Sequence, residues 1–356
     1  MYLPADLHKK ITRDRNPILP IRIEGTGVYR PRKMLNSAEI DCRLGWRSGQ
    51  TAQSYRIESR AVAGPDETSS VMAARAARVA LDAAGIAADE VDLVLGAFGV
   101  GEQPIPATAA LVHAQLGLQQ SGIPAYDIGA TCLSFMAALD HASLKIAAGQ
   151  ARRVLIVSAD IASVGLDWSH PEAAAIFGDG AAAVVLGRQP EAEAGGRQAG
   201  RQAGLLALRM ETWSEGREAC VLAAGGTRIN PARDAGIAPA DALFRMDGQA
   251  AFRVAARRLP RFLARLLASA GVARDQIDVV IPHQASAQAL DHARALIGFG
   301  KTQVVDIFAT HGNQIATSIP TALHHAVTTG RMEKGKLALL IGTSAGISVG
   351  GALIRV

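Results

Sequence analysis

Cysteine and aromatic residues are scarce in this chain. The three cysteines, Cys42, Cys132 and Cys220, lie far apart among 356 residues and form no C-x-x-C pair. An odd, dispersed set of this kind excludes a disulfide scaffold and a cysteine-based metal or redox motif, and we expect a reducing, cytoplasmic location. Because Phe, Tyr and Trp make up only 4% of the chain, small aliphatic residues must fill the core, as in layered helices and buried strands.

Strong charge of one sign and long apolar runs are also missing. The net charge of +5 is too small and diffuse to predict a nucleic-acid-binding surface. The basic residues 1–17 contain no apolar run of the length that a secretory signal needs. The longest uncharged stretch, 337–354, is interrupted by glycines and predicts two short strands around a turn, so we expect no membrane span. The histidines show no ligand spacing, and we predict no metal site.

The chain contains an internal repeat. Residues 80–95 align without gaps on residues 266–281, with seven of the sixteen positions identical. Each copy has the pattern of a helix end, a glycine cap, a short loop and a strand. Residues 138–142 (ALDHA) match residues 322–326 (ALHHA) at nearly the same offset. Two matches in the same order predict two fused copies of one βα unit.

A polar segment separates the two copies. Residues 189–204 (QPEAEAGGRQAGRQAG) contain few apolar residues and predict a solvated connecting loop. We therefore divide the chain into an N-terminal extension (1–20), a first half (21–188), this loop (189–204) and a second half (205–356). Five continuous apolar runs alternate with helical patterns in the halves, which is typical of mainly parallel sheets covered on both faces.

Cys132 has the sequence context of a nucleophile. It lies in AYDIGATCLSFMAAL, where an extended run meets a turn of small residues and a helical pattern starts at about Cys132. A thiol at a helix N-terminus faces the positive end of the helix dipole, so we expect a lowered pKa and a reactive thiolate. A buried structural cysteine is the usual alternative, and the strand-turn-helix context favours the nucleophile. Cys42 and Cys220 lack this context, and we interpret both as structural.

His283 and Asn313 occupy similar transitions in the second half. His283 ends the apolar run DVVIP and precedes a helical pattern, while Asn313 lies between the run VVDIF and another helix. Ligands commonly bind at such strand ends in α/β folds. In the repeat, Cys132 and Asn313 lie in corresponding places of the two copies. We therefore expect the cysteine, the histidine and the asparagine to meet at the junction of the halves.

Four motifs, taken together, resemble a known family. DIGATCLSFMAAL, AAIFGDGAAAVVLG, VIPHQAS and THGNQIATSIP, in this order and spacing, resemble the thiolase superfamily and within it the 3-oxoacyl-(acyl-carrier-protein) synthase III branch. The resemblance extends from about Ile21 to Val356. It implies a thiolase-like five-layered αβαβα fold of two pseudo-symmetric halves, assembled as a homodimer.

The resemblance also implies a role for each motif residue. Cys132 is expected to take an acyl group from a thioester, and His283 and Asn313 to stabilise the enolate that forms when a malonyl thioester loses CO2. The backbone N–H groups of Cys132 and Ala345 would form an oxyanion hole. The substrates would be thioesters of coenzyme A or phosphopantetheine, with no bound cofactor.

Three positions depart from the family's pattern. The chain has GTSAGIS, with Ala345, where members usually have a glycine-rich run, and it has Pro171 where members usually carry an arginine for coenzyme A. These departures weaken the prediction that coenzyme A delivers the acyl group. They do not affect the prediction of the condensation reaction. The acyl pocket is expected to include Phe135 and Ile105. In the family, the position of Ile105 often carries an aromatic or acidic residue that lines the acyl site of the partner subunit.

Basic residues recur at helical spacing in FRVAARRLPRFLARLL. The resemblance and this spacing predict a docking surface for an acidic acyl carrier protein, formed by Arg253, Arg257, Arg258 and Arg261. A solvated helix face without a partner is the alternative.

The favoured function is decarboxylative Claisen condensation to a 3-oxoacyl product, in fatty-acid initiation or a specialised fatty-acid or polyketide-type pathway. A second interpretation keeps the acyl-Cys132 intermediate but transfers the acyl group to a hydroxyl or amine without condensation. A third is a non-catalytic subunit of the same fold. The joint presence of Cys132, His283 and Asn313 argues against the third.

Overall fold

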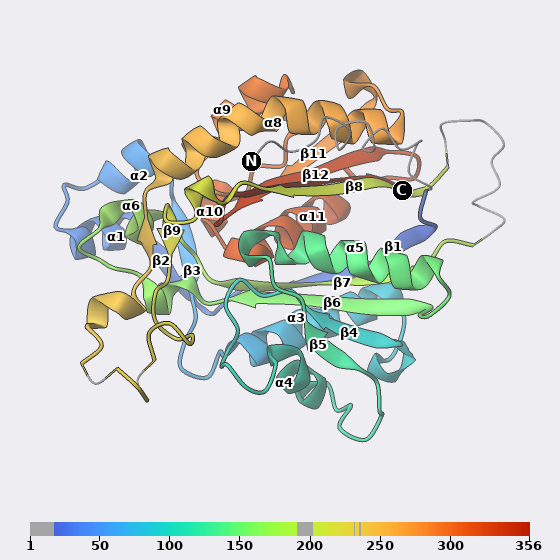
Figure 1. Ribbon diagram of the computed structural model, residues 1–356, viewed down its shortest axis with the longest axis horizontal. Helices are drawn as coiled ribbons and strands as arrows, with labels where there is room; N and C mark the ends of the chain where they lie inside the picture. The colour runs from blue at the N-terminus through green and yellow to red at the C-terminus, as the bar shows by residue number, and fades with distance from the viewer. Residues whose placement is uncertain (1–17, 191–201, 231, 235) are drawn as a thin grey trace, which may run out of the picture.

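The computed structural model describes residues 18–190, 202–230, 232–234 and 236–356, and its elements form five layers. Two sheets alternate with three layers of helices (Figure 1). This arrangement confirms the expected thiolase-like αβαβα fold. Most of the predicted N-terminal extension (1–20) and of the connecting loop (189–204) lies outside the described residues, so those two boundaries stay predictions.

The first sheet has five strands, in the order β1-β7-β6-β4-β5. Its strands are β1 (Ile21–Tyr29), β4 (Leu93–Gly96), β5 (Ala125–Asp127), β6 (Arg153–Asp160) and β7 (Gly180–Arg188). β4 runs parallel to β5 and β6, whereas β7 runs antiparallel to β1 and β6. The strand order places β6 near the centre, where every residue from Val154 to Asp160 is buried.

The second sheet has four strands, in the order β11-β12-β13-β8. Its strands are β8 (Gly204–Thr212), β11 (Val279–Pro282), β12 (Leu337–Ser344) and β13 (Ser348–Arg355). Only β11 and β12 pair in parallel. The prediction of mainly parallel sheets is therefore wrong. Two of the four strand pairings in the first sheet and two of the three in the second are antiparallel, and β12 turns directly back into β13. The predicted pair of short strands in 337–354 is confirmed by the same turn.

Helices cover both sheets on both faces (Figure 1). The outer layers contain α3 (Ser69–Ala84) and α4 (Thr108–Gln115) on one side, and α8 (Gly248–Ala270) and α9 (Ala287–Ile297) on the other. α5 (Ser134–Ala147) and α11 (Ser318–Thr328) lie between the sheets. Buried aliphatic residues of these two helices, such as Leu139 and Leu323, form one core with both sheets.

Shorter elements surround the end of the layers where the site lies. They are β2 (Lys33–Asn36), α1 (Ser37–Leu44), α2 (Gln50–Tyr55), β3 (Ser59–Val62), α6 (Pro171–Ile176), β9 (Cys220–Val221), β10 (Arg245–Met246) and α10 (Phe308–His311). The 3-10 turns are η3 (Ala88–Glu90), η4 (Thr131–Leu133), η5 (Ala162–Gly165), η6 (Ser214–Gly216), η7 (Pro239–Ala242), η8 (Arg274–Gln276), η9 (Lys301–Gln303) and η10 (Ile315–Thr317). No helix in the described residues has both the length and the apolar character needed to cross a membrane.

The sequence repeat corresponds to a structural repeat. Gly85 and Gly271 end α3 and α8 with positive φ angles of 68° and 64°, a backbone conformation that favours glycine. Each is followed by a 3-10 turn and then by a strand, β4 or β11. The two halves therefore share the helix-cap-strand unit that the aligned residues predict.

The turns before α5 and α11 also correspond. Thr131 and Ile315, 184 positions apart, begin η4 and η10 with φ angles of 50° and 52°, which β-branched residues rarely adopt. The hydroxyl of the first residue of each following helix, Ser134 or Ser318, accepts a hydrogen bond from the amide four residues earlier, at 2.8 and 3.0 Å. The same serine hydrogen bond therefore precedes the central helix in both halves. The turns η4 and η10 pack against each other at the junction.

Candidate active site

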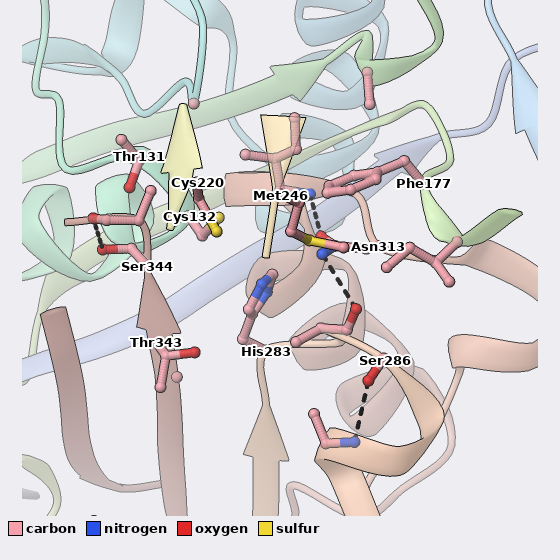
Figure 2. Close-up of a pocket in the computed structure, with 18 of the residues that line it drawn as sticks. Thr131, Cys132, Phe177, Cys220, Met246, His283, Ser286, Asn313, Thr343 and Ser344 are labelled. Carbon is pink, nitrogen blue, oxygen red and sulfur yellow. Dashed lines mark hydrogen bonds between the residues drawn. The ribbon is translucent and has the colours of Figure 1, made fainter. Parts of the chain in front are cut away.

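A single cavity joins the two halves. Its volume is about 1620 Å³, and its wall includes Cys132 from the first half and His283, Asn313 and Ala345 from the second. Figure 2 shows the side chains of Cys132, His283 and Asn313 converging on one space. The structure thus brings together the residues that the sequence places at separate strand-to-helix transitions.

Cys132 lies in η4, just before α5. Cys132 is half-buried, and its side chain lines the cavity. The backbone N–H groups of Ala345 and of Cys132 itself donate hydrogen bonds to the sulfur. These are the two amides expected in the oxyanion hole, and an acyl carbonyl on the sulfur would lie within their reach.

The thiol of Cys132 is protonated at neutral pH. Burial raises its pKa to about 12, the negative charge of Asp160 adds to this effect, and the two backbone N–H groups only partly offset it. The expected lowering of the pKa by the helix N-terminus is therefore wrong. The physical reason is that protein atoms surround the sulfur. The cost of removing a thiolate from water is larger than the stabilisation that hydrogen bonds from the two amides give it. Attack by Cys132 requires a group that accepts its proton.

His283 follows β11 and is almost fully buried. Its backbone amide donates to the carbonyl of Ile341 at 2.8 Å, which fixes it beside β12. A Cβ atom on Gly342 would lie 2.8 Å from the His283 Cβ, so the close approach requires glycine. Burial lowers the pKa of His283 to about 4, and its Nδ1 has no hydrogen-bond partner. The imidazole is therefore neutral, with one nitrogen able to donate and one able to accept.

Asn313 is held rigidly between the halves. Its backbone amide donates to Ile176 O at 2.8 Å, and its side-chain oxygen accepts from Ile315 N at 2.9 Å. The side-chain nitrogen donates to Ala285 O at 3.3 Å, which uses one of its two N–H groups. Gly312 precedes it with a φ of 67°, and a Cβ there would lie 2.5 Å from Ile176 O. The second N–H remains available to a ligand.

Asp160 belongs to the site although the sequence analysis does not single it out. It ends β6, is fully buried and lines the cavity. Its carboxylate accepts hydrogen bonds from Gly99 N at 2.7 Å and from the amide and hydroxyl of Thr317 at 3.1 and 3.0 Å. Burial raises its pKa to about 6. An aspartate at the end of an apolar strand is common and does not by itself indicate a site. Only the fold shows that Asp160 contacts the other half of the chain.

The expected acyl-pocket residues do not line this cavity. Phe135 points into the core between the sheets, where it is 1% exposed. Its place on α5, one residue into the helix, turns it away from Cys132. Ile105 is 85% exposed and lies on the loop before α4, so it lines nothing in its own chain. The apolar wall includes instead Phe177, Leu222, Phe244, Met246, Leu290 and Ile315.

The four arginines expected to dock a carrier protein have different surroundings. Arg253, Arg257 and Arg261 are exposed on α8, and Arg253 lines the cavity. Arg258 is half-buried, forms an ion pair with Glu215 at 3.2 Å and covers the ring of Trp213. Arg258 thus has an acidic and an aromatic partner within the chain, unlike the other three arginines, and the docking surface stays a prediction.

Cys220 lies in the cavity wall, a position that its sequence context does not predict. It lies on β9, opposite Met246 of β10, and lines the same cavity as Cys132. A solitary cysteine in a loop-rich segment gives no signal of this position. Only the fold of β9 and β10 over the cavity brings its thiol to the site.

Comparisons with known proteins agree on one family. The family model described as 3-oxoacyl-[acyl-carrier-protein (ACP)] synthase III matches residues 126–201, and its C-terminal counterpart matches residues 267–356. A relative from Rhizorhabdus wittichii, a beta-ketoacyl-[acyl-carrier-protein] synthase III, is 35% identical over 93% of this chain and 98% of its own length. A relative of the same name from Thiobacillus denitrificans is 34% identical over 94% and 98%.

The chain belongs to the beta-ketoacyl-[acyl-carrier-protein] synthase III family. The crystal structure of the Aquifex aeolicus 3-oxoacyl-[acyl-carrier-protein] synthase III covers 94% of this chain and 100% of its own, with a TM-score of 0.81 and 31% identity. Membership of this family makes the chain a condensing enzyme of the transferase class. It also confirms the resemblance found in the four motifs.

Proposed function

We propose that Cys132 accepts an acyl group from a thioester and that the acyl group then condenses with a malonyl thioester to give a 3-oxoacyl product. The observation that carries this proposal is the shared cavity, where one thiol faces two backbone N–H groups, a neutral imidazole and an amide N–H. This set supplies a nucleophile, an oxyanion hole and donors for an enolate.

Acylation requires a route for the thiol proton. The raised pKa of Cys132 means that the thiol gives up its proton only as it attacks. His283 lies in the same cavity and its neutral ring has a nitrogen lone pair that can accept this proton. The proton then passes to the departing carrier thiolate, which leaves as a thiol. Cys132 holds the acyl group as a thioester, and His283 is neutral again.

Condensation uses the donors of the second half. When the malonyl carboxylate leaves as CO2, its electron pair moves into an enolate whose oxygen gains charge. His283, with its one ring proton moved after acylation to the nitrogen that faces the substrate, and the second N–H of Asn313 would hold that oxygen. The enolate carbon attacks the acyl carbonyl, the amides of Cys132 and Ala345 hold the new oxyanion, and the Cys132 sulfur leaves. Each donor is fixed by the backbone before substrate arrives.

We further propose that phosphopantetheine thioesters of an acyl carrier protein deliver the substrates. The cavity is larger than the range of about 300–1,000 Å³ that is usual for small-ligand pockets, which leaves space for an acyl chain and a pantetheine arm. Arg253, Arg257 and Arg261 are exposed on α8 without an ion-pair partner among the described residues. They would attract an acidic carrier to the cavity mouth.

A homodimer is the proposed assembly. Val100 and Ile105, on the loop before α4, are apolar and exposed at 54% and 85%. Self-association through this loop would remove both from water. Sedimentation of the purified protein tests this: a dimer is expected at micromolar concentration, and a monomer would contradict it.

The release of CO2 tests the proposed reaction. A malonyl thioester carrying a labelled free carboxyl group is offered with an acyl thioester. Equal amounts of labelled CO2 and 3-oxoacyl product are expected. A product ester or amide formed without CO2 would instead support acyl transfer to a hydroxyl or amine, the alternative in which Asn313 would have no enolate to hold.

A further inference from the structure

The cavity contains a second thiol that the proposed reaction does not use. Of the three cysteines in the chain, Cys42 is exposed on α1, whereas Cys132 and Cys220 both line the cavity. They come from different segments, one from η4 before α5 and the other from the short strand β9. Figure 2 shows their sulfur atoms pointing toward one another.

The two thiols act on one another electrostatically, and Cys220 has no part in the proposed condensation. The charge that Cys220 would carry as a thiolate raises the pKa of Cys132, an effect that grows as two groups approach each other. Burial raises the pKa of Cys220 itself to about 11. Cys220 packs against an apolar cluster that contains Ala219 and Ile347, and the negative charges of Glu172 and Asp247 raise its pKa further. Any small aliphatic side chain would fill this place, so the thiol adds a reactivity that packing does not need.

We propose that Cys132 and Cys220 are a redox pair, which a peroxide converts into an intramolecular disulfide that blocks acylation and spares the nucleophile from irreversible oxidation. The bond would occupy the sulfur that must attack the acyl thioester. Reduction by a dithiol would restore both thiols and the activity.

The chemistry proceeds in two balanced steps. As neutral His283 accepts the thiol proton, the Cys132 sulfur attacks one oxygen of hydrogen peroxide and the O–O bond breaks. The proton passes to the leaving hydroxide, so that Cys132 becomes a sulfenic acid and one water is released. The Cys220 sulfur then attacks the Cys132 sulfur, the S–OH bond breaks, and a second water leaves with the Cys220 proton. Two thiols are oxidised by two electrons in total, and one peroxide is reduced to two waters. Without a neighbouring thiol, a sulfenic acid proceeds to the irreversible sulfinic and sulfonic acids.

Mass spectrometry of the full-length protein tests this pair directly. The substrate-free enzyme is treated with hydrogen peroxide, free thiols are alkylated, and the peptides are mapped. We expect a linked Cys132–Cys220 peptide, a mass loss of two hydrogens and an alkylated Cys42. Prior incubation with an acyl thioester should prevent the link, because Cys132 is then occupied. An oxygenated Cys132 beside a free, alkylated Cys220 would overturn the proposal.

Matched variants separate the pair from the third cysteine. After peroxide and then dithiothreitol, wild type and Cys42→Ser should regain at least about half of their own starting activity, whereas Cys220→Ser should regain almost none and should carry added oxygens on Cys132. Recovery of Cys220→Ser to the wild-type fraction would overturn the proposal. Cys220→Ala repeats the test with an apolar side chain. The peptide map of the wild type depends on no variant and on no activity assay. It therefore tests the disulfide even if the proposed condensation reaction is wrong.

Discussion

The carboxylate of Asp160 accepts hydrogen bonds from both the backbone amide and the hydroxyl of Thr317, at 3.1 and 3.0 Å. Asp160 ends β6 in the half that provides Cys132, and Thr317 ends η10 in the half that provides Asn313. This contact crosses the junction in the buried interior. The same carboxylate also raises the pKa of the Cys132 thiol by its charge, so it links the geometry of the site with the reactivity of the nucleophile.

Replacement of Asp160 by asparagine should make Cys132 easier to ionise. Asp160→Asn removes the negative charge that opposes a thiolate and keeps a side chain of similar shape. The pH dependence of iodoacetamide alkylation at Cys132 measures the effect, and its midpoint should move to lower pH. An unchanged or higher midpoint would contradict the electrostatic link.

The same variant should alter the pH dependence of stability. The pKa of Asp160 is raised from its ordinary value of 3.8 to about 6, so the fold favours the protonated carboxyl. The free energy by which the protonated carboxyl of Asp160 stabilises the folded state is present below about pH 4 and is lost as the pH rises through 6. Relative to Asp160→Asn, wild type should therefore lose on the order of 3 kcal/mol of unfolding free energy between pH 4 and 6. Urea unfolding at each pH checks this, and a difference that grows in the opposite direction would disprove it.

A methyl group on Gly342 should displace His283. A Cβ at this position would lie 2.8 Å from the Cβ of His283 and 3.2 Å from a methyl carbon of Leu133. Gly342→Ala is therefore expected to cost about 1–3 kcal/mol of stability through overpacking and to slow condensation. Gly226→Ala is the control, because a Cβ there would meet open space and the residue does not line the cavity. Wild-type condensation by Gly342→Ala would contradict the close approach.

Loss of the imidazole should slow both proposed half-reactions. His283→Ala removes the proposed acceptor of the Cys132 proton and one proposed donor to the enolate oxygen, so CO2 release should fall by about 100- to 1,000-fold. Because its pKa is about 4, His283 stays neutral above pH 5, and any activity loss of wild type between pH 5 and 7 must arise elsewhere. Stopped assays over this range check both points. Equal CO2 release by His283→Ala and wild type would exclude the proposed role.

Reversal of charge on α8 should weaken carrier binding selectively. The double variant Arg257→Glu and Arg261→Glu, at two exposed positions that do not line the cavity, should raise KM for a carrier-bound substrate about tenfold or more, with a smaller effect at high salt. The KM for a short pantetheine thioester should change little. Arg152→Glu, outside the cavity wall, is the matched control. Equal effects on both substrates would indicate damage to the site.

The sequence predicts the fold and the three motif residues well because their signals are local. The glycine cap at Gly85 and its copy at Gly271 mark the repeat, and the apolar runs mark the strands. Cys132, His283 and Asn313 each stand at a strand-to-helix transition, which a linear pattern can reveal. Their meeting follows from the symmetry of the two halves.

The sequence fails where a property depends on distant residues. The raised pKa of Cys132 results from enclosure by both halves and from Asp160, and neither is adjacent in sequence. Phe135 lies three residues from the nucleophile yet faces the core, because the rotation of the helix decides its direction. Arg258 shares a motif with three exposed arginines, but Glu215 and Trp213 reach it from another segment.

The central claim is that Cys132 is the acyl carrier of a condensation reaction. A panel of coenzyme A and carrier-bound acyl thioesters is offered to wild type and to Cys132→Ala, followed by intact mass and then by addition of a malonyl thioester. Wild type should gain one acyl mass on the peptide with Cys132 and lose it as the 3-oxoacyl product forms. Cys132→Ala should gain none and form no product. Product formation by Cys132→Ala at the wild-type rate would contradict the claim.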